Sequence, residues 1–470
     1  MLKSKIKSIK ITGVTLISLL LISIGLILVW KSEDYGLQIH KIDVEVLREI
    51  FLHGKSIVYI TIKANKMVYF PPPLKAWRFG DIIILKYYAD YELLKKVSKY
   101  IIYACKPKEN YIFEPFKILI ENQLKSDLEI AKSYKGDIKL KYHKVSERWT
   151  GKGIIVAIVD SGVDYLHPDL KDNIYMLVSI VVRTKQGNPI IWINGINGTL
   201  EQAWEFEQEF YNETKMYMWM DEIGHGTHIA GIIAGTGKAS NGMIRGFAPN
   251  SKIISIKAFI NVTTSIDAIL DALKWIEKNA KKYNITIVNL SLGVAVPSNG
   301  LDPISLACDK LVEQGLIIFA SAGNMFALPF TITSPGSARK VITIGAINPY
   351  TDKIPLFTSL GLTIDGRIKP DFVCAGVWVL STKPITVTSL FEKVKPEIVY
   401  NKYYMYLSGT SMSCAVASGL ACEYIEWYIY VFHKKPSSRV IYELFKRYAR
   451  KINPWFKDFI TGEGVPRGIP

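Results

Sequence analysis

Hydrophobic positions follow three successive patterns along this chain. The first is the run ITGVTLISLLLISIGLILVW, which covers residues 11–30 and contains no charged residue. In a helix these 20 residues reach roughly 30 Å at about 1.5 Å per residue, which is the thickness of the hydrocarbon core of a bilayer. The run therefore predicts a transmembrane helix.

The sequence around this run favours an uncleaved signal anchor over the alternative, a cleaved signal peptide. A signal peptide usually has an apolar stretch of about 7 to 15 residues that ends in an A-x-A-like site. Nothing of this kind follows Trp30, and the small residues Ser23 and Gly25 lie inside the run. Four lysines and no acidic residue precede it, which predicts a cytoplasmic basic tail over residues 1–10. We expect a cell-membrane protein whose chain beyond residue 31 lies outside the cell, or one secreted after processing.

The second pattern, over residues 31–130, predicts a small α+β domain. Strand candidates are SIVYITIKA and DIIILKYY, separated by three prolines, and a helix is predicted from Tyr91 to Ile102. A stretch rich in lysine, aspartate and serine follows this region. Because it holds few large apolar residues, we interpret residues 131–144 as a linker.

The third pattern begins near Gly153 and predicts an α/β domain over residues 145–470. Near-continuous apolar runs alternate there with helical stretches such as Ser265–Lys281 and Asp302–Gln314. Such runs are typical of parallel strands that are buried on both faces. The strand candidates are IIVAIVD, KIISIKAF, ITIVNLSLG, GLIIFASAGN and VITIGAI. We expect a parallel sheet flanked by helices, with its chemistry at the carboxyl ends of the strands.

Composition and charge exclude several classes of protein. Hydrophobic residues make up 49% of the chain and charged residues 21%, which suits a large core and excludes wholesale disorder. The net charge is +16, but the lysines are scattered singly rather than gathered in one stripe, so nucleic-acid binding is not expected. The five cysteines form no CxxC pair, which argues against a zinc site of that kind.

Two strand-associated polar residues are candidates for chemistry. Asp160 closes a buried apolar run, where a carboxylate needs a partner, although such a residue is more often a helix cap. His225 lies between Gly224 and Gly226, which leave space beside the imidazole. His228 follows three residues later and suggests a metal site, but no third ligand stands at a standard spacing.

Two further candidates come later in the chain. Ser411 precedes the predicted helix Met412–Glu426, so its hydroxyl would lie at a helix N-terminus that favours developing negative charge. A serine at this place is usually only a cap. Asn324 directly follows a predicted buried strand and could donate its amide to an oxyanion.

Four motifs together resemble those of the subtilisin-like serine proteases, the subtilase family. They are DSGVDYLHPDL, GHGTHIAGIIAG, SAGN and GTSMSCAVASG, in this order, within a resemblance that covers about residues 145–450. The resemblance implies a serine endopeptidase in which Ser411 attacks, His225 transfers protons and Asp160 orients the imidazole. Asn324 and the backbone N–H of Ser411 would hold the oxyanion.

The resemblance also implies a substrate-binding region and a zymogen. The substrate would be a protein or peptide, bound along the segments Ser291, Leu292, Gly293 and Ser321, Ala322, Gly323. Residues 31–130 would be a prodomain that assists folding and inhibits the enzyme, with a processing site in the linker. No cofactor is required; relatives often bind calcium, but no ligand residue is assigned.

Two points stay open from the sequence alone. The stretch 171–222 is long and rich in aromatic residues, and we interpret it as a surface insertion near the cleft. The alternative function is a catalytically silent, membrane-tethered binding protein with the same fold. The complete set of Asp160, His225, Asn324 and Ser411 favours the enzyme, because a binding protein has no physical need for all four.

Overall fold

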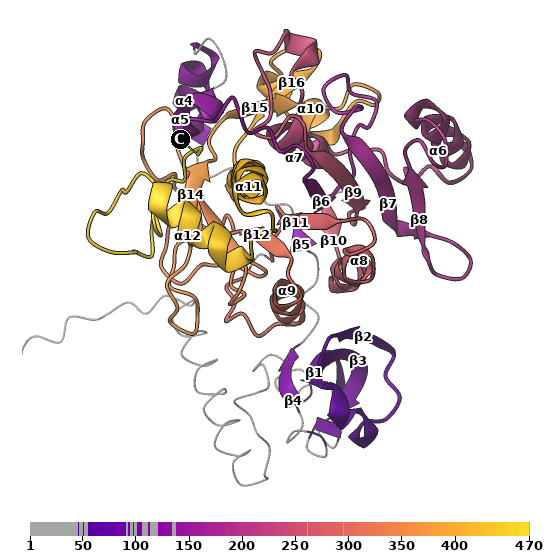
Figure 1. Ribbon diagram of the computed structural model, residues 1–470. Helices are drawn as coiled ribbons and strands as arrows, with labels where there is room; N and C mark the ends of the chain where they lie inside the picture. Colours follow the sequence, from indigo (N-terminus) through magenta and orange to yellow (C-terminus); the bar gives the residue numbers. More distant parts are fainter. Residues whose placement is uncertain are drawn as a thin grey trace, which may run out of the picture. The chain divides into compact units, whose positions relative to one another are not determined.

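The computed structural model divides the chain into two compact units, residues 1–107 and 108–470. The predicted basic tail 1–10 and the predicted anchor 11–30 lie outside the described residues. Within the described part of the chain, no helix combines the length and apolar character needed to cross a membrane. The described residues (Figure 1) are 46, 50, 55–90, 93, 94, 97, 101–105, 111–112, 121–133, 138–260, 262–294 and 296–469.

The first unit contains a four-stranded antiparallel sheet in the order β2-β3-β1-β4. Both predicted strands are present, as β1 and β3. The predicted helix Tyr91–Ile102 ends earlier than expected, because Ile101 and Ile102 belong to a strand that pairs with β1. Alternate residues of β1, such as Val58, Ile60 and Ile62, are buried in one apolar cluster. The bounds are β1 Lys55–Lys63, η2 Ala64–Tyr69, β2 Lys75–Phe79, β3 Ile82–Asp90 and β4 Ile101–Cys105.

The second unit is built on an eight-stranded sheet in the order β14-β13-β12-β11-β6-β9-β7-β8. All neighbours are parallel except the edge pair β7 and β8. The five strand candidates of the sequence are confirmed as β6, β9, β11, β12 and β13. The bounds are β6 Ile155–Asp160, β7 Ile174–Arg183, β8 Pro189–Ile193, β9 Lys252–Lys257, β11 Ile285–Leu290, β12 Ile317–Ser321, β13 Ile342–Ile347 and β14 Phe372–Ala375.

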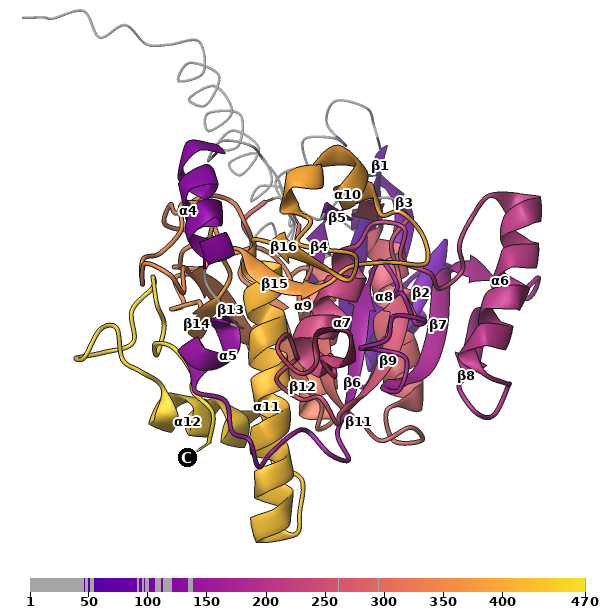
Figure 2. The same cartoon turned by 90° about the horizontal axis from the view of Figure 1, so that it is seen from above.

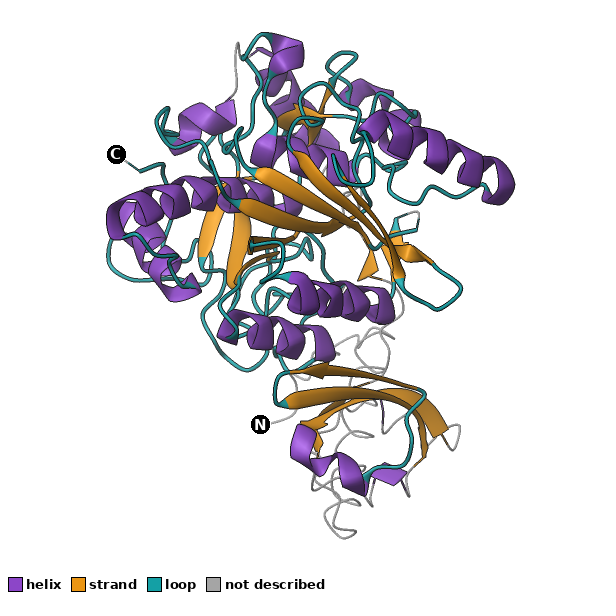
Figure 3. Cartoon of the chain, turned by 45° about the vertical axis from the view of Figure 1, so that its right-hand side comes forward, coloured by secondary structure: helices purple, strands orange, loops and turns teal. Residues whose placement is uncertain are grey.

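Helices cover both faces of this sheet (Figure 3). On one face α7 (His225–Ala234) and α11 (Thr410–Phe432) pack against each other, with α11 against β11 to β14. On the opposite face α8 (Ile266–Asn279) and α9 (Pro303–Glu313) pack together, as Figure 1 shows. The view from above in Figure 2 shows the long α11 beside α7. The termini of α8 and α9 lie close to the predicted limits.

Local sequence explains where α8 and α9 begin. Ser265 caps α8 by accepting a hydrogen bond of 3.1 Å from the backbone N–H of Ala268. Asp302 caps α9 in the same way, and Pro303 occupies the first turn, where no backbone donor is needed. Apolar residues of α8 recur at helical spacing and are buried: Ile266, Ile269, Leu270, Leu273 and Ile276.

Two smaller pairs of strands and several short helices complete the second unit. The strands β15 and β16 pair antiparallel, as do β5 and β10. The remaining bounds are β5 Tyr111–Ile112, α4 Glu121–Ser133, α5 Ile138–His143, α6 Leu200–Thr214, η4 Lys238–Ser240, β10 Thr263–Thr264, β15 Val379–Thr382, α10 Leu390–Val394, η5 Pro396–Ile398, β16 Tyr404–Leu407 and α12 Ser438–Tyr448.

The stretch predicted as a linker, 131–144, differs from that expectation, because it contains the packed helix α5. His143 is fully buried: its Nδ1 donates to the Pro466 carbonyl at 2.6 Å, and its Nε2 accepts from the Ala375 N–H at 3.1 Å. Lys139 is also buried and donates to the Leu380 carbonyl at 3.3 Å. Polar residues satisfied by backbone groups leave no apolar signal in the sequence, so this packing could not be predicted.

The stretch 171–222 is only partly an insertion on the surface. β7 pairs with β9 inside the main sheet, and most of its side chains are buried. The expectation of a surface segment beginning at residue 171 was therefore wrong for β7. The hairpin strand β8 and the helix α6 extend beyond the sheet's central part, as Figure 1 shows.

Candidate active site

Asp160 and His225 meet at the carboxyl end of the central strand β6. Asp160 is the last residue of β6, and His225 is the first residue of α7. The imidazole Nδ1 lies 2.9 Å and 3.1 Å from the two carboxylate oxygens, and both side chains are buried. Since a carboxylate accepts hydrogen bonds, Nδ1 carries the proton and Nε2 is the basic nitrogen of the neutral ring. Burial raises the pKa of Asp160, and its bonds to His225 and to the Ser161 N–H limit that rise.

Glycine is required beside the histidine by close packing. A Cβ atom on Gly226 would lie 2.1 Å from the Gly162 carbonyl oxygen and 2.9 Å from Asp160 Oδ1. The backbone N–H of Gly226 donates to Ser161 Oγ at 2.9 Å. Gly224 has a φ of 103°, in the region that favours glycine. The two glycines flanking His225 therefore let α7 begin directly against the end of β6.

Ser411 lies in the first turn of α11 and is hydrogen-bonded to the end of the neighbouring strand β11 rather than to β6. It is the second residue of α11, and its Oγ donates to the Ser291 carbonyl at 2.9 Å. Ser291 Oγ in turn donates to the Ser411 carbonyl at 2.8 Å. Ser291 directly follows β11, which pairs with β6. The first turn of α11 is thus attached to the same sheet edge that carries Asp160.

Asn324 is oriented toward the turn that precedes Ser411. Its Oδ1 accepts hydrogen bonds from the Thr410 N–H at 3.0 Å and from Thr410 Oγ1 at 2.9 Å. This arrangement leaves the amide Nδ2 as the remaining donor end of the side chain. A Cβ atom on Gly409 would lie 3.5 Å from Nδ2, so the donor is close to the same turn.

The two predicted substrate-binding segments, Ser291–Gly293 and Ser321–Gly323, leave adjacent parallel strands, β11 and β12. Thr333 lies between them. A Cβ atom on Gly293 would be 2.8 Å from Thr333 Oγ1, and one on Gly323 would be 2.6 Å from it. The structure therefore brings both segments to one place beside Ser411.

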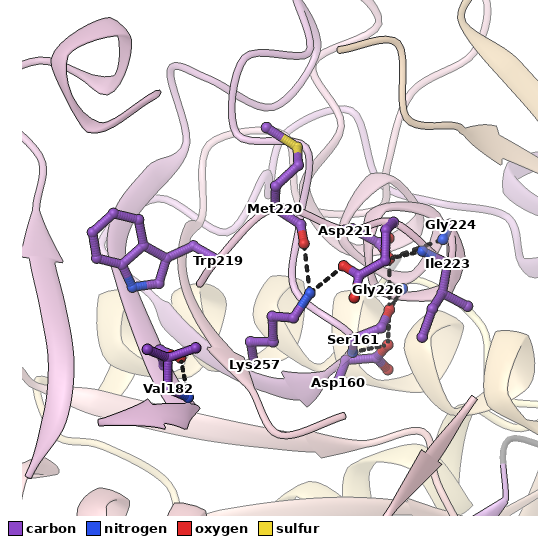
Figure 4. Close-up of polar contacts among 12 residues, drawn as sticks. Asp160, Ser161, Val182, Trp219, Met220, Asp221, Ile223, Gly224, Gly226 and Lys257 are labelled. Carbon is purple, nitrogen blue, oxygen red and sulfur yellow. Dashed lines mark hydrogen bonds and ion pairs between the residues drawn. The ribbon is translucent and has the colours of Figure 1, made fainter. Parts of the chain in front are cut away.

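Asp221 was missed by reasoning from the sequence, although it connects the elements that carry the site. Its Oδ1 accepts from Ser161 Oγ at 2.8 Å and from the Gly224 N–H at 2.8 Å (Figure 4). Its Oδ2 accepts from the N–H and the hydroxyl of Thr227 at 2.8 Å and 2.7 Å. The only sequence signal is an acidic residue four positions before the histidine, and acidic residues most often face solvent.

His228 has a structural role, because its ring is hydrogen-bonded to backbone carbonyls. It is fully buried, and its Nε2 lies 3.0 Å from the Val379 carbonyl and 3.2 Å from the Met405 carbonyl. Burial lowers the pKa of His228 to about 3. Across the residues that the structure describes, no three His, Cys, Asp or Glu side chains gather as a metal site would require.

The fold and the site together define a class of protein. A mainly parallel sheet flanked by helices, with Asp, His and Ser in that chain order at one sheet edge, is the arrangement of the subtilisin-like serine endopeptidases. The family model described as the Subtilase family matches residues 151–431. The chain belongs to this family.

Named relatives agree with this assignment. The chain is 30% identical to "Serine protease AprX" of Bacillus subtilis (strain 168) over 285 residues, which cover 58% of this chain and 57% of the relative. It is 28% identical to "Thermophilic serine proteinase" of Bacillus sp. (strain AK1) over 267 residues, 57% of this chain and 50% of the relative. The match thus spans about half the length of these relatives.

Solved structures share the fold. Fervidolysin from Fervidobacterium pennivorans, described as a keratinolytic enzyme related to subtilisin, has a TM-score of 0.56 at 20% identity. That match covers 88% of this chain and 60% of fervidolysin. Sphericase has a TM-score of 0.53 at 24% identity, and the match covers 71% of this chain and 99% of sphericase.

Proposed function

We propose that this chain is a serine endopeptidase that hydrolyses peptide bonds through Asp160, His225 and Ser411. The observation that carries the proposal is the buried contact, 2.9 Å long, between His225 Nδ1 and the Asp160 carboxylate, on the helix α7 that packs against α11. This contact holds Nε2 as a base and stabilises the imidazolium that forms when it takes a proton. A catalytically silent binding protein, the alternative function, would not require this buried Asp160–His225 pair.

The chemistry follows from the positions of the groups. When substrate binds, Ser411 Oγ exchanges its hydrogen bond with the Ser291 carbonyl for one with His225 Nε2. Ser411 Oγ then attacks the peptide carbonyl carbon while Nε2 takes its proton, and Nε2 passes that proton to the leaving amine. Water then attacks the acyl-enzyme while Nε2 takes its proton. Nε2 returns that proton to Ser411 Oγ as the carboxylic acid product leaves.

The oxyanion and the substrate backbone have separate partners. Asn324 Nδ2 and the Ser411 N–H would donate to the oxyanion, since Asn324 Oδ1 is already engaged by Thr410. The segments Ser291–Gly293 and Ser321–Gly323 would pair with an extended peptide through their backbone groups. Recognition of this kind depends on main chain more than on side chains. Proteins and peptides of varied sequence are the substrate class that we propose.

The first unit would be a prodomain that the enzyme removes. Its small antiparallel sheet and its place ahead of the catalytic unit support this. The strand β5 follows the first unit and pairs antiparallel with β10, which comes shortly after β9, the neighbour of β6. Residues 111–112, soon after the first unit, thus pair with a strand of the catalytic unit. Since the packed helix α5 is a poor site for cleavage, we extend the processing region upstream, from 131–144 to 108–144.

Residues 11–30 would anchor the zymogen in the membrane, with the catalytic unit outside the cell. Cleavage between residues 108 and 144 would separate the catalytic unit from this anchor. The uncharged 20-residue run and the four lysines ahead of it support this part of the proposal.

Labelling with a fluorophosphonate probe, which reacts with activated serines, tests the function directly. Wild type should be labelled and should hydrolyse a peptide library, whereas Ser411→Ala should do neither. Ser413→Ala is the matched control, because this nearby buried hydroxyl only donates to the Cys374 carbonyl at 3.0 Å. Wild type that is folded but neither labelled nor active would contradict the proposal and favour the silent binding protein.

A further inference from the structure

The helix α6 presents a buried carboxylate to the segment that leads into the histidine. Glu207 has no exposed surface, and its Oε1 accepts from the Trp219 N–H at 2.5 Å and the Met220 N–H at 3.0 Å. Its Oε2 accepts from the Tyr165 hydroxyl at 2.6 Å. A buried carboxylate is costly without such partners, so these three bonds fix Glu207 and its partners to one another.

The Trp219–Met220 peptide is also held from other directions. The Trp219 carbonyl accepts from the Val163 N–H at 3.2 Å. The Met220 carbonyl accepts from Lys257 Nζ at 2.7 Å, and the same ammonium pairs with Glu222 (Figure 4). Lys257 stands opposite Asp160 in the register of β9 and β6. The main sheet and α6 therefore clamp this peptide from two sides.

The clamped peptide is joined directly to the active site. The next residue is Asp221, which binds Ser161 Oγ and the Gly224 N–H. Ser161 donates to Asp160, and Gly224 is bonded covalently to His225. A shift of Met220 would therefore reach both Asp160 and His225 through Asp221.

A pocket of about 680 Å³ lies beside this segment, and Glu222, Ile223, Tyr211, Lys215 and Tyr217 are among the residues that line it. Ile223 is nevertheless fully buried, and the Leu390 and Phe391 N–H groups of α10 donate to the Glu222 and Ile223 carbonyls at 2.8 Å and 3.2 Å. Hydrogen bonds from α10 at residues 222–223 and from Glu207 at Trp219 and Met220 therefore both hold the segment that leads into His225.

We propose that Glu207 is a positioning residue for the catalytic His225, and that α6 is a working part of the active site. The inference rests on the proposed protease function and extends it. This proposal gives a role to β8 and α6, the outer part of the stretch 171–222. Both elements contact Trp219, which lies two residues before Asp221. Trp219 Nε1 donates to the Ile190 carbonyl of β8 at 3.2 Å.

Three variants in the full chain test this role by steady-state kinetics on a peptide substrate. Glu207→Ala should lower kcat by about 10- to 100-fold, with KM changed by less than about threefold, because a small misplacement of a catalytic group is costly. Glu207→Gln should restore most of the rate, since its amide oxygen accepts from the two N–H groups and its NH₂ donates to the Tyr165 oxygen.

Leu200→Ala is the matched control, because Leu200 is a buried residue of the same helix that makes none of these bonds. It should lower the unfolding temperature and leave kcat unchanged in folded enzyme. The pH profile gives a second readout: Glu207→Ala should move the acidic limb of kcat/KM, whereas Leu200→Ala should not, since only the first disturbs the Asp160–His225 contact.

Unchanged kcat and pH profile in folded Glu207→Ala would overturn the proposal. If Glu207→Ala does not fold, Glu207→Asp takes its place, because the shorter carboxylate cannot reach all three donors; unchanged kinetics in that variant would overturn it equally. An inactive wild type would instead contradict the protease function, so the two failures are distinguishable.

Discussion

Asn324 shows how a single side chain is set up for one task. Thr410 occupies its oxygen through two hydrogen bonds, so the amide nitrogen has one orientation. We expect Asn324→Ala to lower kcat by about 10²- to 10³-fold with little change in KM, a magnitude that comes from the equivalent donor in subtilisin. Steady-state kinetics on a peptide substrate check this. A fall in kcat/KM that came entirely from KM would show that Asn324 binds substrate rather than the oxyanion.

His143 gives the stability of the protein a dependence on pH. Burial lowers its pKa from 6.5 to about 4, and the charges of Arg450 and Arg467 also lower it. Between pH 6.5 and 4, His143 is therefore protonated in the unfolded chain and neutral in the folded chain. The free energy of unfolding consequently decreases as the pH falls through this range. By linkage the cost is ~3 kcal/mol at and below pH 4.

Replacing His143 by glutamine tests this cost. Its amide can donate to the Pro466 carbonyl and accept from the Ala375 N–H without titrating. Denaturant unfolding at several pH values should show a shallower loss of stability in His143→Gln than in wild type between pH 6.5 and 4. Parallel curves for the two proteins would contradict the account. His228, buried with a pKa of about 3, should contribute to the slope that remains.

At the scale of elements, α7 depends on a glycine where it crosses β15. A Cβ atom on Gly231 would lie 2.1 Å from Thr382 Oγ1 and 2.5 Å from Ser381 Oγ. Both hydroxyls donate to carbonyls of α7, so neither can move away without losing a bond. Gly231→Ala should cost about 1 to 3 kcal/mol of stability through overpacking. It should also reduce activity, because α7 begins with His225.

Denaturant unfolding of Gly231→Ala beside Gly187→Asn measures this effect. Gly187 has open space where a Cβ would stand and a φ of 79°, which asparagine tolerates. The control should therefore lose less than Gly231→Ala. Equal losses would mean that backbone conformation, rather than the contact with β15, explains the cost.

The elements predicted best from the sequence are those with a strong local pattern. β6, β9 and β11 are buried on both faces, so their apolar runs are continuous and easily recognised. β14 has only four residues, too few for a pattern. β7 is equally apolar, but its place beside β9 in the sheet depends on a long-range pairing.

The candidate site was predictable where motifs are local and unpredictable where partners are distant. Asp160, His225, Asn324 and Ser411 are predicted from their motifs, and the structure brings Asp160 and His225 into direct contact. Glu207 and Asp221 are acidic residues in an aromatic-rich stretch, with nothing local to indicate that their carboxylates are buried. Their partners are backbone N–H groups and hydroxyl groups, among them Ser161 and Tyr165 in the segment that follows β6, so only the folded chain shows what they hold.

At the scale of the whole molecule, the order of the parts suggests how activity is controlled. A predicted anchor, a small first unit and a catalytic unit follow one another, and the compact units divide at residues 107 and 108. If the first unit is a prodomain, its removal depends on the same Ser411 that performs all other cleavage. Removal of the first unit by the chain itself would therefore show that Ser411 is catalytically active.

Intact-mass and N-terminal analysis of the expressed full chain, wild type beside Ser411→Ala, tests the central claim most directly. We predict that wild type converts to a fragment that begins between residues 108 and 144, while Ser411→Ala remains at full length. Identical processing of both chains would assign the cleavage to another protease. Folded wild type that stays at full length and does not react with a serine probe would contradict the account.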